Sequence, residues 1–244
     1  MLIKIKKIRN KMQKNEIMLI TGTRKGIGRY LAEYYAKKGY CVIGCSREKS
    51  DLNIKDYEHY IADVAKEDDI RDMIDGVSKK HGRLDIVINN AGIASMNHTL
   101  LTPLNTVRKI FDTNFVGTFL VCREGAKLMK RNNYGRIVNF GTVAVPLKLE
   151  GEAVYSASKS AIMVFTQILA KELAPFGITC NTVCPTIVDT DLIKSVPKDK
   201  LQRILDNQSI KRYAKPDDIS NVIDFFIRKE SNFITGQTIF LGGV

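Results

Sequence analysis

Thr21-Gly-Thr-Arg-Lys-Gly-Ile-Gly28 is the stretch that decides the fold of this 244-residue chain. An apolar run at residues 17–20 precedes it, and a helical pattern follows it from residue 28. Gly22, Gly26 and Gly28 allow a tight turn and a close approach of the backbone to a ligand. The N–H groups at the start of the following helix favour a bound anion such as a pyrophosphate. The stretch therefore predicts a strand–turn–helix unit that binds a dinucleotide.

Apolar runs of strand length alternate with helical patterns through most of the chain. The runs cover residues 17–20, 41–45, 60–62, 86–88, 137–140 and 178–183, and the amphipathic stretches cover 28–38, 68–80 and 154–173. Such runs are typical of parallel strands buried on both faces, and right-handed crossovers place helices on each face. We predict an α/β fold, a single Rossmann domain over residues 16–244 whose doubly wound parallel sheet has about seven strands.

The end of the second predicted strand indicates which dinucleotide is bound. NAD-binding folds carry Asp or Glu there to bond the ribose 2′-hydroxyl, but here Ser46 and Arg47 follow the strand, and no acid occurs before Glu48. Serine and arginine can bond a 2′-phosphate, which an acid would repel. Lys25 in the first turn faces the same region, whereas we interpret Arg24 as surface charge. We therefore predict NADP(H) as the cofactor.

Tyr155 and Lys159 are the candidate pair for proton transfer. They are four residues apart in one predicted helix, so they lie one turn apart on the same face. A free tyrosine has a pKa of about 10 and is a poor base at neutral pH. A nearby ammonium in a partly desolvated cleft, helped by the positive charge of an oxidised nicotinamide, would lower that pKa. The spacing alone is common in helices, so the pair gains meaning only from its context.

In order and spacing, these motifs resemble the short-chain dehydrogenases/reductases. The resemblance covers about residues 16–243 and includes the glycine turn, Asp63, Asn89-Asn-Ala-Gly92, Asn114 and Tyr155-x-x-x-Lys159. It implies that Tyr155 is the general acid in reduction and the base in oxidation. It also implies that Lys159 lowers the tyrosine's pKa and holds the nicotinamide ribose, and that Asn114 anchors a water of the proton relay.

The resemblance also implies a set of cofactor contacts. Asp63 and Val64 would bond the adenine, Asn90 and Gly92 would lie along the cofactor, and Thr190 would reach the nicotinamide carboxamide. The full predicted cofactor set is Gly22, Thr23, Lys25, Gly26, Ile27, Gly28, Ser46, Arg47, Asp63, Val64, Asn90, Ala91, Gly92, Tyr155, Lys159, Pro185, Ile187 and Thr190. The predicted catalytic set is Asn114, Thr142, Tyr155 and Lys159.

Three positions depart from the family's pattern. Thr142 stands where the family has its catalytic serine; it keeps the hydroxyl that would polarise the substrate carbonyl, while its methyl group restricts the side chain. We expect activity to survive this change. Thr186 replaces a glycine after Pro185, which disfavours backbone conformations that need glycine and is expected to reshape the nicotinamide-side wall. The C-terminal Phe240-Leu-Gly-Gly-Val lacks the acid or amide that often precedes its two glycines.

Hydride transfer from NADPH to a ketone is the reaction that these residues predict. The overall pattern looks most like the 3-oxoacyl-acyl-carrier-protein reductases, and Lys127, Lys130 and Arg131 would suit an acidic carrier protein, although a solvated helix end explains them equally. Phe176 stands where some reductases of that type use a basic residue. A loop and helix at residues 191–207, which mix apolar residues with lysines, would cover the substrate. Reduction of a sugar or another small ketone, and a catalytically weak NADP-binding sensor, remain alternatives.

Charge sets the first fifteen residues apart from the rest. The chain carries a formal net charge of +12, and Lys4, Lys6, Lys7, Arg9, Lys11 and Lys14 fall in a basic extension at residues 1–15. Such an arm can bind nucleic acid or an anionic membrane, but no aromatic interleaving accompanies it, so we interpret it as a solvated tail and expect no nucleic-acid partner. Translation from Met12 would remove most of it.

Other features of the sequence limit where the protein is located and how it assembles. The chain has no apolar run of about 18 residues and no signal-peptide pattern, so we predict a cytoplasmic protein without a membrane span. Five cysteines and the scattered His59, His81 and His98 show neither a disulfide framework nor ligand spacing, and we predict no metal site. The family resemblance implies a homotetramer, or a dimer, in which helices at residues 114–130 and 154–173 pack between subunits.

Overall fold

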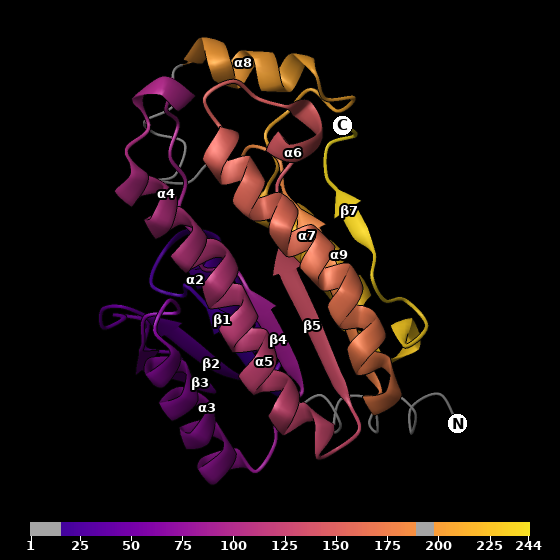
Figure 1. Cartoon of the computed structure of the whole chain (residues 1–244). Helices are drawn as coiled ribbons and strands as arrows, with labels where there is room; N and C mark the ends of the chain where they lie inside the picture. Colours follow the sequence, from indigo (N-terminus) through magenta and orange to yellow (C-terminus); the bar gives the residue numbers. More distant parts are fainter. Residues whose placement is uncertain (1–15, 189–197) are drawn as a thin grey trace.

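A seven-stranded parallel sheet forms the centre of the molecule, with strand order β3-β2-β1-β4-β5-β6-β7 (Figure 1). The computed structural model describes residues 16–188 and 198–244. The strands are β1 (Ile17–Thr21), β2 (Cys41–Ser46), β3 (Tyr57–Ile61), β4 (Ile86–Asn89), β5 (Gly135–Phe140), β6 (Ile178–Cys184) and β7 (Thr238–Phe240). Every pair of neighbouring strands is parallel, which confirms the predicted doubly wound fold.

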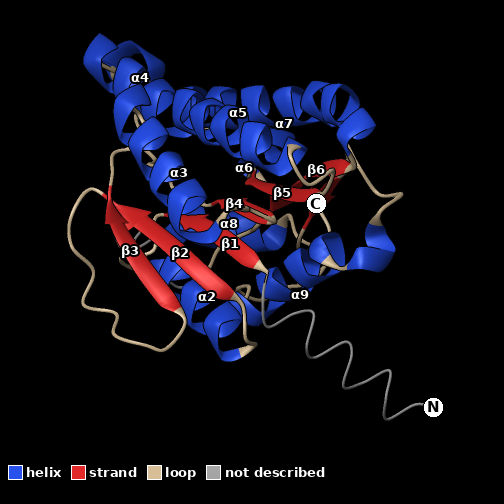
Figure 2. Ribbon diagram, turned by 90° about the horizontal axis from the view of Figure 1, so that it is seen from below, coloured by secondary structure: helices blue, strands red, loops and turns tan. Residues whose placement is uncertain are grey.

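Helices cover both faces of the sheet (Figure 2). The helices are α2 (Gly26–Lys37), α3 (Glu67–His81), α4 (Leu104–Phe111), α5 (Gly117–Lys130), α6 (Ala144–Leu147), α7 (Ala153–Leu173), α8 (Lys198–Asp206) and α9 (Pro216–Ile227). Helices α3, α5 and α7 bury their apolar stripes on one face, and α2 and α9 bury theirs on the other. In these described residues, no helix is long and apolar enough to cross a membrane.

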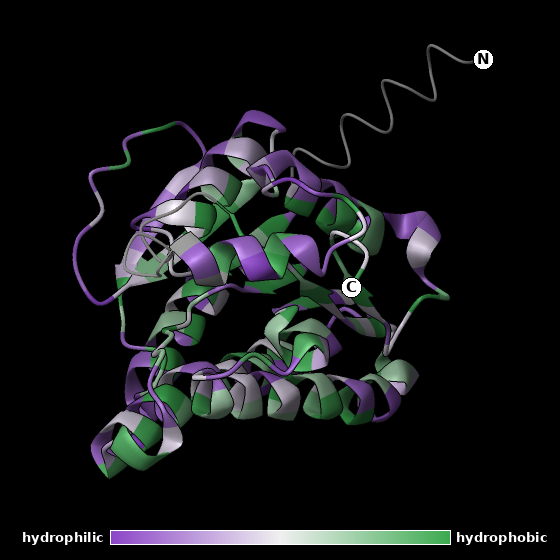
Figure 3. Cartoon of the chain, turned by 90° about the horizontal axis from the view of Figure 1, so that it is seen from above, coloured by the Kyte–Doolittle hydropathy of each residue, from purple (hydrophilic) through white to green (hydrophobic). Residues whose placement is uncertain are grey.

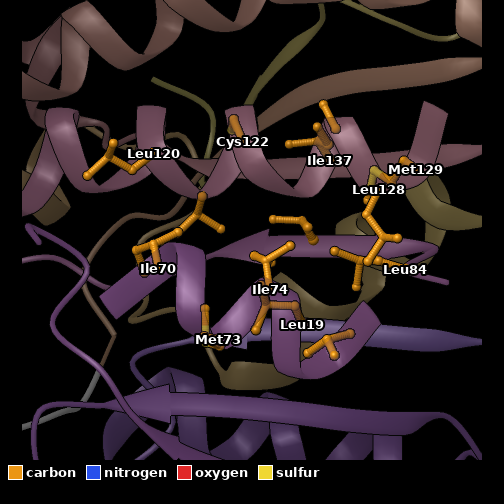
Figure 4. Close-up of a cluster of buried hydrophobic side chains, with 14 of the residues drawn as sticks. Leu19, Ile70, Met73, Ile74, Leu84, Leu120, Cys122, Leu128, Met129 and Ile137 are labelled. Carbon is orange, nitrogen blue, oxygen red and sulfur yellow. The ribbon is translucent and has the colours of Figure 1, made fainter. Parts of the chain in front are cut away.

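Two hydrophobic cores result from the alternation of side chains along each strand. In β1, Leu19 points into the core under α3 and α5, while Met18 and Ile20 point into the core under α2 and α9. Figure 4 shows the first core, where Ile74 of α3 and Met129 of α5 point toward the sheet. Because both faces are covered, the central strands carry apolar residues at nearly every position, as the sequence predicts.

The edge strand β3 differs from its prediction. It occupies Tyr57–Ile61 rather than residues 60–62, and its residues are partly exposed instead of buried on both faces. An edge strand has one neighbour and tolerates polar side chains such as Glu58 and His59, which hid its start in the hydrophobicity pattern. The helix expected from residue 114 is also longer: α4, the π-turn Asp112–Val116 and α5 run on continuously from Leu104.

The order of the strands places a crevice between β1 and β4. The chain winds from β1 outward to β3, and then from β4 outward to β7 in the opposite direction. In such sheets, ligands bind outside the carboxyl ends of the strands at the point where the winding reverses. Helix α8 lies across this end of the molecule, as seen from above in Figure 3, and its Leu201 and Ile204 pack with Ile187.

Candidate active site

A cavity of about 800 Å³ opens at the carboxyl ends of the strands. It brings together nearly all of the residues predicted from the sequence. Those that line it are Gly22, Lys25, Gly26, Ile27, Gly28, Ser46, Arg47, Asp63, Val64, Asn90, Ala91, Gly92, Thr142, Tyr155, Lys159, Pro185 and Ile187. Thr23 and Asn114 are fully buried behind this lining, and Thr190 lies outside the described residues.

The glycine-rich turn is built for close contact. Gly22 has a φ of 76° and Gly26 a φ of 60°, which side chains rarely adopt. A Cβ atom at Gly28 would overlap the carbonyl oxygen of Gly22, so no other residue fits there. None of the described side chains caps the start of α2, and its first turn has no acid. Its N–H groups therefore remain available for an anion in the cavity.

Hydrogen bonds hold the turn against the end of β4. The Asn90 amide donates to the carbonyl oxygen of Thr21 at 2.8 Å, and Thr21 Oγ1 accepts from the backbone N–H groups of Asn90 and Ala91 at 3.1 and 2.9 Å. These contacts join the two strands that flank the crevice. The role of Thr21 was not predicted, because it depends on a partner nearly seventy residues away in the chain.

Basic and hydroxyl groups gather where the second strand ends. Ser46, Arg47 and Lys25 line the cavity there. Arg24, interpreted from the sequence as surface charge, is partly exposed, forms an ion pair with Glu48 and also lines the cavity. Arg24 belongs to the glycine-rich turn. The backbone N–H groups of Gly22 and Thr23 donate to the carbonyl oxygen of Cys45 in β2, so the turn lies beside the end of that strand. Arg24, Lys25 and Arg47 therefore bring three cations to this part of the cavity.

His59 and Tyr57 connect this corner to the glycine turn, and sequence reasoning missed both. His59 Nε2 lies 3.0 Å from Ser46 Oγ, and its Nδ1 lies 2.8 Å from the Tyr57 hydroxyl. That hydroxyl in turn lies 2.8 Å from Thr23 Oγ1. Burial lowers the pKa of His59. The neutral ring has one donor and one acceptor, so this chain of hydrogen bonds can orient the Ser46 hydroxyl.

Tyr155, Thr142 and Lys159 meet beyond the end of β5. Thr142 follows that strand, and its hydroxyl accepts from the N–H of Ala144 at 3.2 Å and hydrogen-bonds to Tyr155. Lys159, one helical turn after Tyr155, is buried and donates to the carbonyl oxygen of Phe140 at 2.9 Å. The ammonium therefore lies beside the strand end, 6.0 Å from the centre of the Tyr155 ring.

The pKa of Tyr155 moves opposite to its predicted direction. Burial raises the pKa of Tyr155 to about 12, although the Thr142 hydrogen bond acts to lower it. Burial also lowers the pKa of Lys159 to about 8. In the protein alone, desolvation outweighs any effect of the lysine on the tyrosine, since both groups are deep in the site. Tyr155 consequently holds its proton at neutral pH, which suits a proton donor.

Asn114 sits in the π-turn between α4 and α5. Its side-chain amide donates to the carbonyl oxygen of Ile93 at 2.9 Å and to Ser158 Oγ at 3.0 Å, and it accepts from the Ile93 N–H at 2.8 Å. A Cβ atom at Gly92 would come within 3.4 Å of both Asn114 Oδ1 and Lys159 Nζ. A side chain at Gly92 would therefore press against both of these groups. Such π-turns occur frequently at functional sites.

Thr186 has a partner that the sequence did not reveal. The Thr186 hydroxyl donates to the buried side chain of Gln208, whose amide donates to the carbonyl oxygens of Ile210 at 3.0 Å and Arg212 at 3.2 Å. The backbone of Thr186 has no positive φ, so threonine fits without strain. This contact ties the cavity wall to the segment after α8, whose Ile210 N–H bonds the carbonyl oxygen of Gly242.

Replacing Gln208 with leucine is expected to lower the free energy of unfolding by about 2 kcal/mol, because it leaves the buried Thr186 hydroxyl without a partner. Urea denaturation measures this. The matched control is Thr186→Val combined with Gln208→Leu, which removes both partners and should cost less than the sum of the single changes. Strictly additive losses would contradict the coupling.

The basic residues predicted to suit a carrier protein lie away from the cavity. Helix α5 connects β4 to the parallel strand β5, so its C-terminal end is at the opposite edge of the sheet (Figure 1). There Lys127 pairs with Glu124 at 2.9 Å, and Lys130 Nζ lies 4.3 Å from the centre of the Phe176 ring. Arg131 donates to Ser78 Oγ at 3.1 Å. Within one chain, none of the three faces the mouth of the site.

Comparison with known proteins agrees with this geometry. The family model described as short chain dehydrogenase matches residues 16–201. The 3-oxoacyl-[acyl-carrier-protein] reductase FabG of Staphylococcus epidermidis is 31% identical, over 94% of this chain and 98% of its own, and the Escherichia coli FabG is 30% identical, over 93% and 96%. The ligand-free aldohexose dehydrogenase of Thermoplasma acidophilum has a TM-score of 0.86 at 27% identity, covering 95% of this chain and 94% of its own. ElxO with NADP bound has a TM-score of 0.85 at 28% identity, covering 93% and 97%.

Proposed function

This chain belongs to the short-chain dehydrogenase family, and from that premise we propose that it reduces a ketone to a secondary alcohol with NADPH. The observation that carries the proposal is a single cavity whose one end is an anion-binding glycine turn and whose other end holds Tyr155, Thr142 and Lys159. One end suits a dinucleotide and the other suits proton transfer. A reductase requires both in one cavity, because the hydride of the dinucleotide and the proton of the protein must reach the same carbonyl group.

The residues present fit a dinucleotide. Because Gly28 has no Cβ atom, the turn can pack closely against Gly22 and Asn90, and the uncapped start of α2 offers N–H groups to a pyrophosphate. Asp63, Val64 and Lys159 line the same cavity; in this proposal Asp63 and Val64 would contact the adenine, and Lys159 would hold the nicotinamide ribose. When bound, NADPH supplies the hydride.

The chain's own groups supply the proton and the polarisation. Tyr155 holds its proton at neutral pH and donates it to the carbonyl oxygen of the substrate as hydride arrives. The Thr142 hydroxyl, which already bonds Tyr155, lies where it can bond the same oxygen. Lys159 carries positive charge below its pKa of about 8 and stabilises the phenolate that the transfer leaves behind.

NADP(H), rather than NAD(H), follows from the charge at the end of β2. Arg24, Lys25 and Arg47 offer three cations, with Ser46 and its His59 partner as hydrogen-bonding groups. A phosphate dianion gains charge-assisted hydrogen bonds from such groups. The similar structure of ElxO holds NADP, which supports the same choice here.

Replacing Arg47 with alanine is expected to raise the KM for NADPH about tenfold, since a lost charge-assisted bond of about 1.4 kcal/mol corresponds to a factor of ten. The KM for NADH should stay nearly unchanged. Initial-rate kinetics with both cofactors measures the difference, and Arg131→Ala at the far edge is the matched control. An equal change for the two cofactors would contradict a 2′-phosphate contact.

A 3-oxoacyl thioester is the substrate class that we propose. The cavity wall includes Ile187, Leu149, Leu201 and Ile204, an apolar surface that suits an acyl chain better than a sugar's hydroxyl groups. Relatives named as 3-oxoacyl-[acyl-carrier-protein] reductases cover nearly the whole chain. Attachment of that acyl chain to a carrier protein is part of the proposal, with docking at a surface other than the end of α5.

The test is NADPH oxidation with a panel of 3-oxoacyl thioesters, small diketones and an oxidised sugar. We expect the highest kcat/KM with the thioesters. A higher kcat/KM with the oxidised sugar would contradict the proposed substrate class but would still support an NADPH-dependent reductase. Tight NADPH binding without turnover of any compound would instead favour an NADP-binding sensor.

We also propose that the chain forms a homotetramer through α5 and α7. Phe119, Val164 and Ile168 are exposed on these two helices, and the Phe119 ring lies 5.8 Å from the ring of Phe165. An apolar surface of this kind is typical of an interface between subunits. Light scattering of the purified protein is expected to give four times the mass of the chain, and Ile168→Glu should reduce it.

A further inference from the structure

Cys41, Glu58 and His81 converge at the edge of the sheet that faces away from the cavity. Cys41 is the first residue of β2, Glu58 the second of β3, and His81 the last of α3. One sulfur, oxygen or nitrogen ligand atom of each lies within 4.8 Å of the other two. Four of the five cysteines are buried, whereas Cys41 is partly exposed and open to a small ion.

The fold brings the three residues together. Parallel strands begin at one edge of the sheet, so the starts of β2 and β3 are neighbours. Helix α3 lies beside both strands (Figure 1) and, as the crossover to β4, ends at the edge where they begin. Gly76 lets α3 approach closely, because a Cβ atom there would come within 2.9 Å of the Tyr60 hydroxyl. Gly82, in the left-handed region, then ends the helix at His81.

The surroundings of the cluster favour a cation. His81 Nε2 is buried, lacks a hydrogen-bond partner among the described residues, and lies 3.4 Å from Glu58 Oε1. The carboxylates of Glu58 and Asp56 lie near the Cys41 thiol. The C-terminal end of α3 adds the negative end of its helix dipole. A divalent ion would satisfy the unpartnered imidazole and offset this negative field.

We propose that Cys41, Glu58 and His81 bind one Zn²⁺ ion, with water as the fourth ligand. Thiolate, imidazole and carboxylate are the ligand types that zinc takes in proteins, with bonds of about 2.0–2.3 Å. Ligand atoms in such a tetrahedral site are about 3.5 Å apart. The ligand atoms of the three residues already lie within 4.8 Å of one another, so side-chain rotations that move them by about 1 Å would bring them to the tetrahedral spacing. On binding, the Cys41 thiol loses its proton to solvent and its sulfur bonds the metal.

Lys80 competes with the ion. Its ammonium lies 2.8 Å from Glu58 Oε1, the same oxygen that faces His81. Its side chain is 60% exposed, so it can swing into solvent when a divalent ion replaces it. Removing the lysine should therefore tighten zinc binding, whereas a cluster without a metal role would show no such gain.

Titration of the purified full-length protein with Zn²⁺ against a chromophoric chelator tests the proposal. We expect one ion per chain, a Kd at least about tenfold weaker in Cys41→Ser and in His81→Ala, and a Kd severalfold tighter in Lys80→Ala. His98→Ala removes a histidine elsewhere on the surface and is the matched control. NADPH binding, measured on every variant, reports whether the fold survives independently of catalysis.

Co²⁺ gives a second readout that a structural role would not produce. Wild-type protein should show a thiolate-to-cobalt charge-transfer band that Cys41→Ser lacks, and Zn²⁺ should protect Cys41 from alkylation as measured by mass spectrometry. Zinc binding that is equally strong in wild type and Cys41→Ser would overturn the proposal, as would the absence of any stoichiometric zinc. Neither outcome depends on the proposed reductase activity, because the cluster is at the other edge of the sheet.

Discussion

Replacing Tyr155 with phenylalanine is expected to lower kcat by about 10²–10⁴-fold, the usual contribution of a positioned proton donor. The ring keeps its packing, so NADPH binding should change little. The physical reason is that burial raises the pKa of Tyr155 to about 12, so its hydroxyl keeps a proton at neutral pH in the cavity, whereas the Lys159 ammonium donates to the carbonyl oxygen of Phe140. Steady-state rates with the best substrate of the panel, together with NADPH titration, measure both effects.

A Tyr155→Phe variant that keeps more than about a tenth of the wild-type kcat would remove Tyr155 as proton donor. Loss of NADPH binding in the same variant would point to a disturbed site instead. In that case the disturbance would involve the position of Lys159, which is held by its hydrogen bond to the carbonyl oxygen of Phe140.

Replacing Thr142 with alanine is expected to lower kcat about 10²–10³-fold, since it removes a hydrogen-bond donor from the oxygen that gains charge in the transition state. Thr142→Ser keeps the hydroxyl and should retain most of the activity. It should also accept bulkier ketones, because the threonine methyl group narrows the pocket and restricts the side chain. The kinetics of both variants with short and branched substrates measure these effects.

The paired design separates two roles for Thr142. If the hydroxyl acts on the substrate, serine rescues what alanine loses. If Thr142 only packs the wall after β5, where it is buried, then serine and alanine should lose activity alike. Equal activity in all three proteins would show that Tyr155 works without a neighbouring hydroxyl.

Much of the fold could be predicted because its signals are local. Strands buried on both faces need apolar residues in unbroken runs, and β1, β2 and β6 fall within a residue or two of the predicted ranges. The turn at Gly22–Gly28 was predictable because its backbone conformation and close contacts exclude side chains. The Tyr155–Lys159 spacing was predictable because a helix places residues four apart on one face.

Other features were hidden because they depend on neighbours far along the chain. The start of β3 was missed, since an edge strand tolerates polar residues. The raised pKa of Tyr155 follows from its burial in the assembled cavity. Gln208 could not be matched to Thr186, and His59 could not be matched to Ser46, because hydrogen bonds across such separations leave no periodic pattern.

The glycine turn has some features that the sequence alone determines and others that depend on tertiary contacts. Its residues alone indicate a strand–turn–helix and a bound dinucleotide, because backbone freedom and an uncapped helix start are local properties. Folding then adds what no spacing contains: Asn90 locks the turn to β4, and Arg24 reaches the cavity. The same holds for His81, which by spacing alone offered no metal site. It meets Cys41 and Glu58 only because parallel strands start at one edge and α3 ends there.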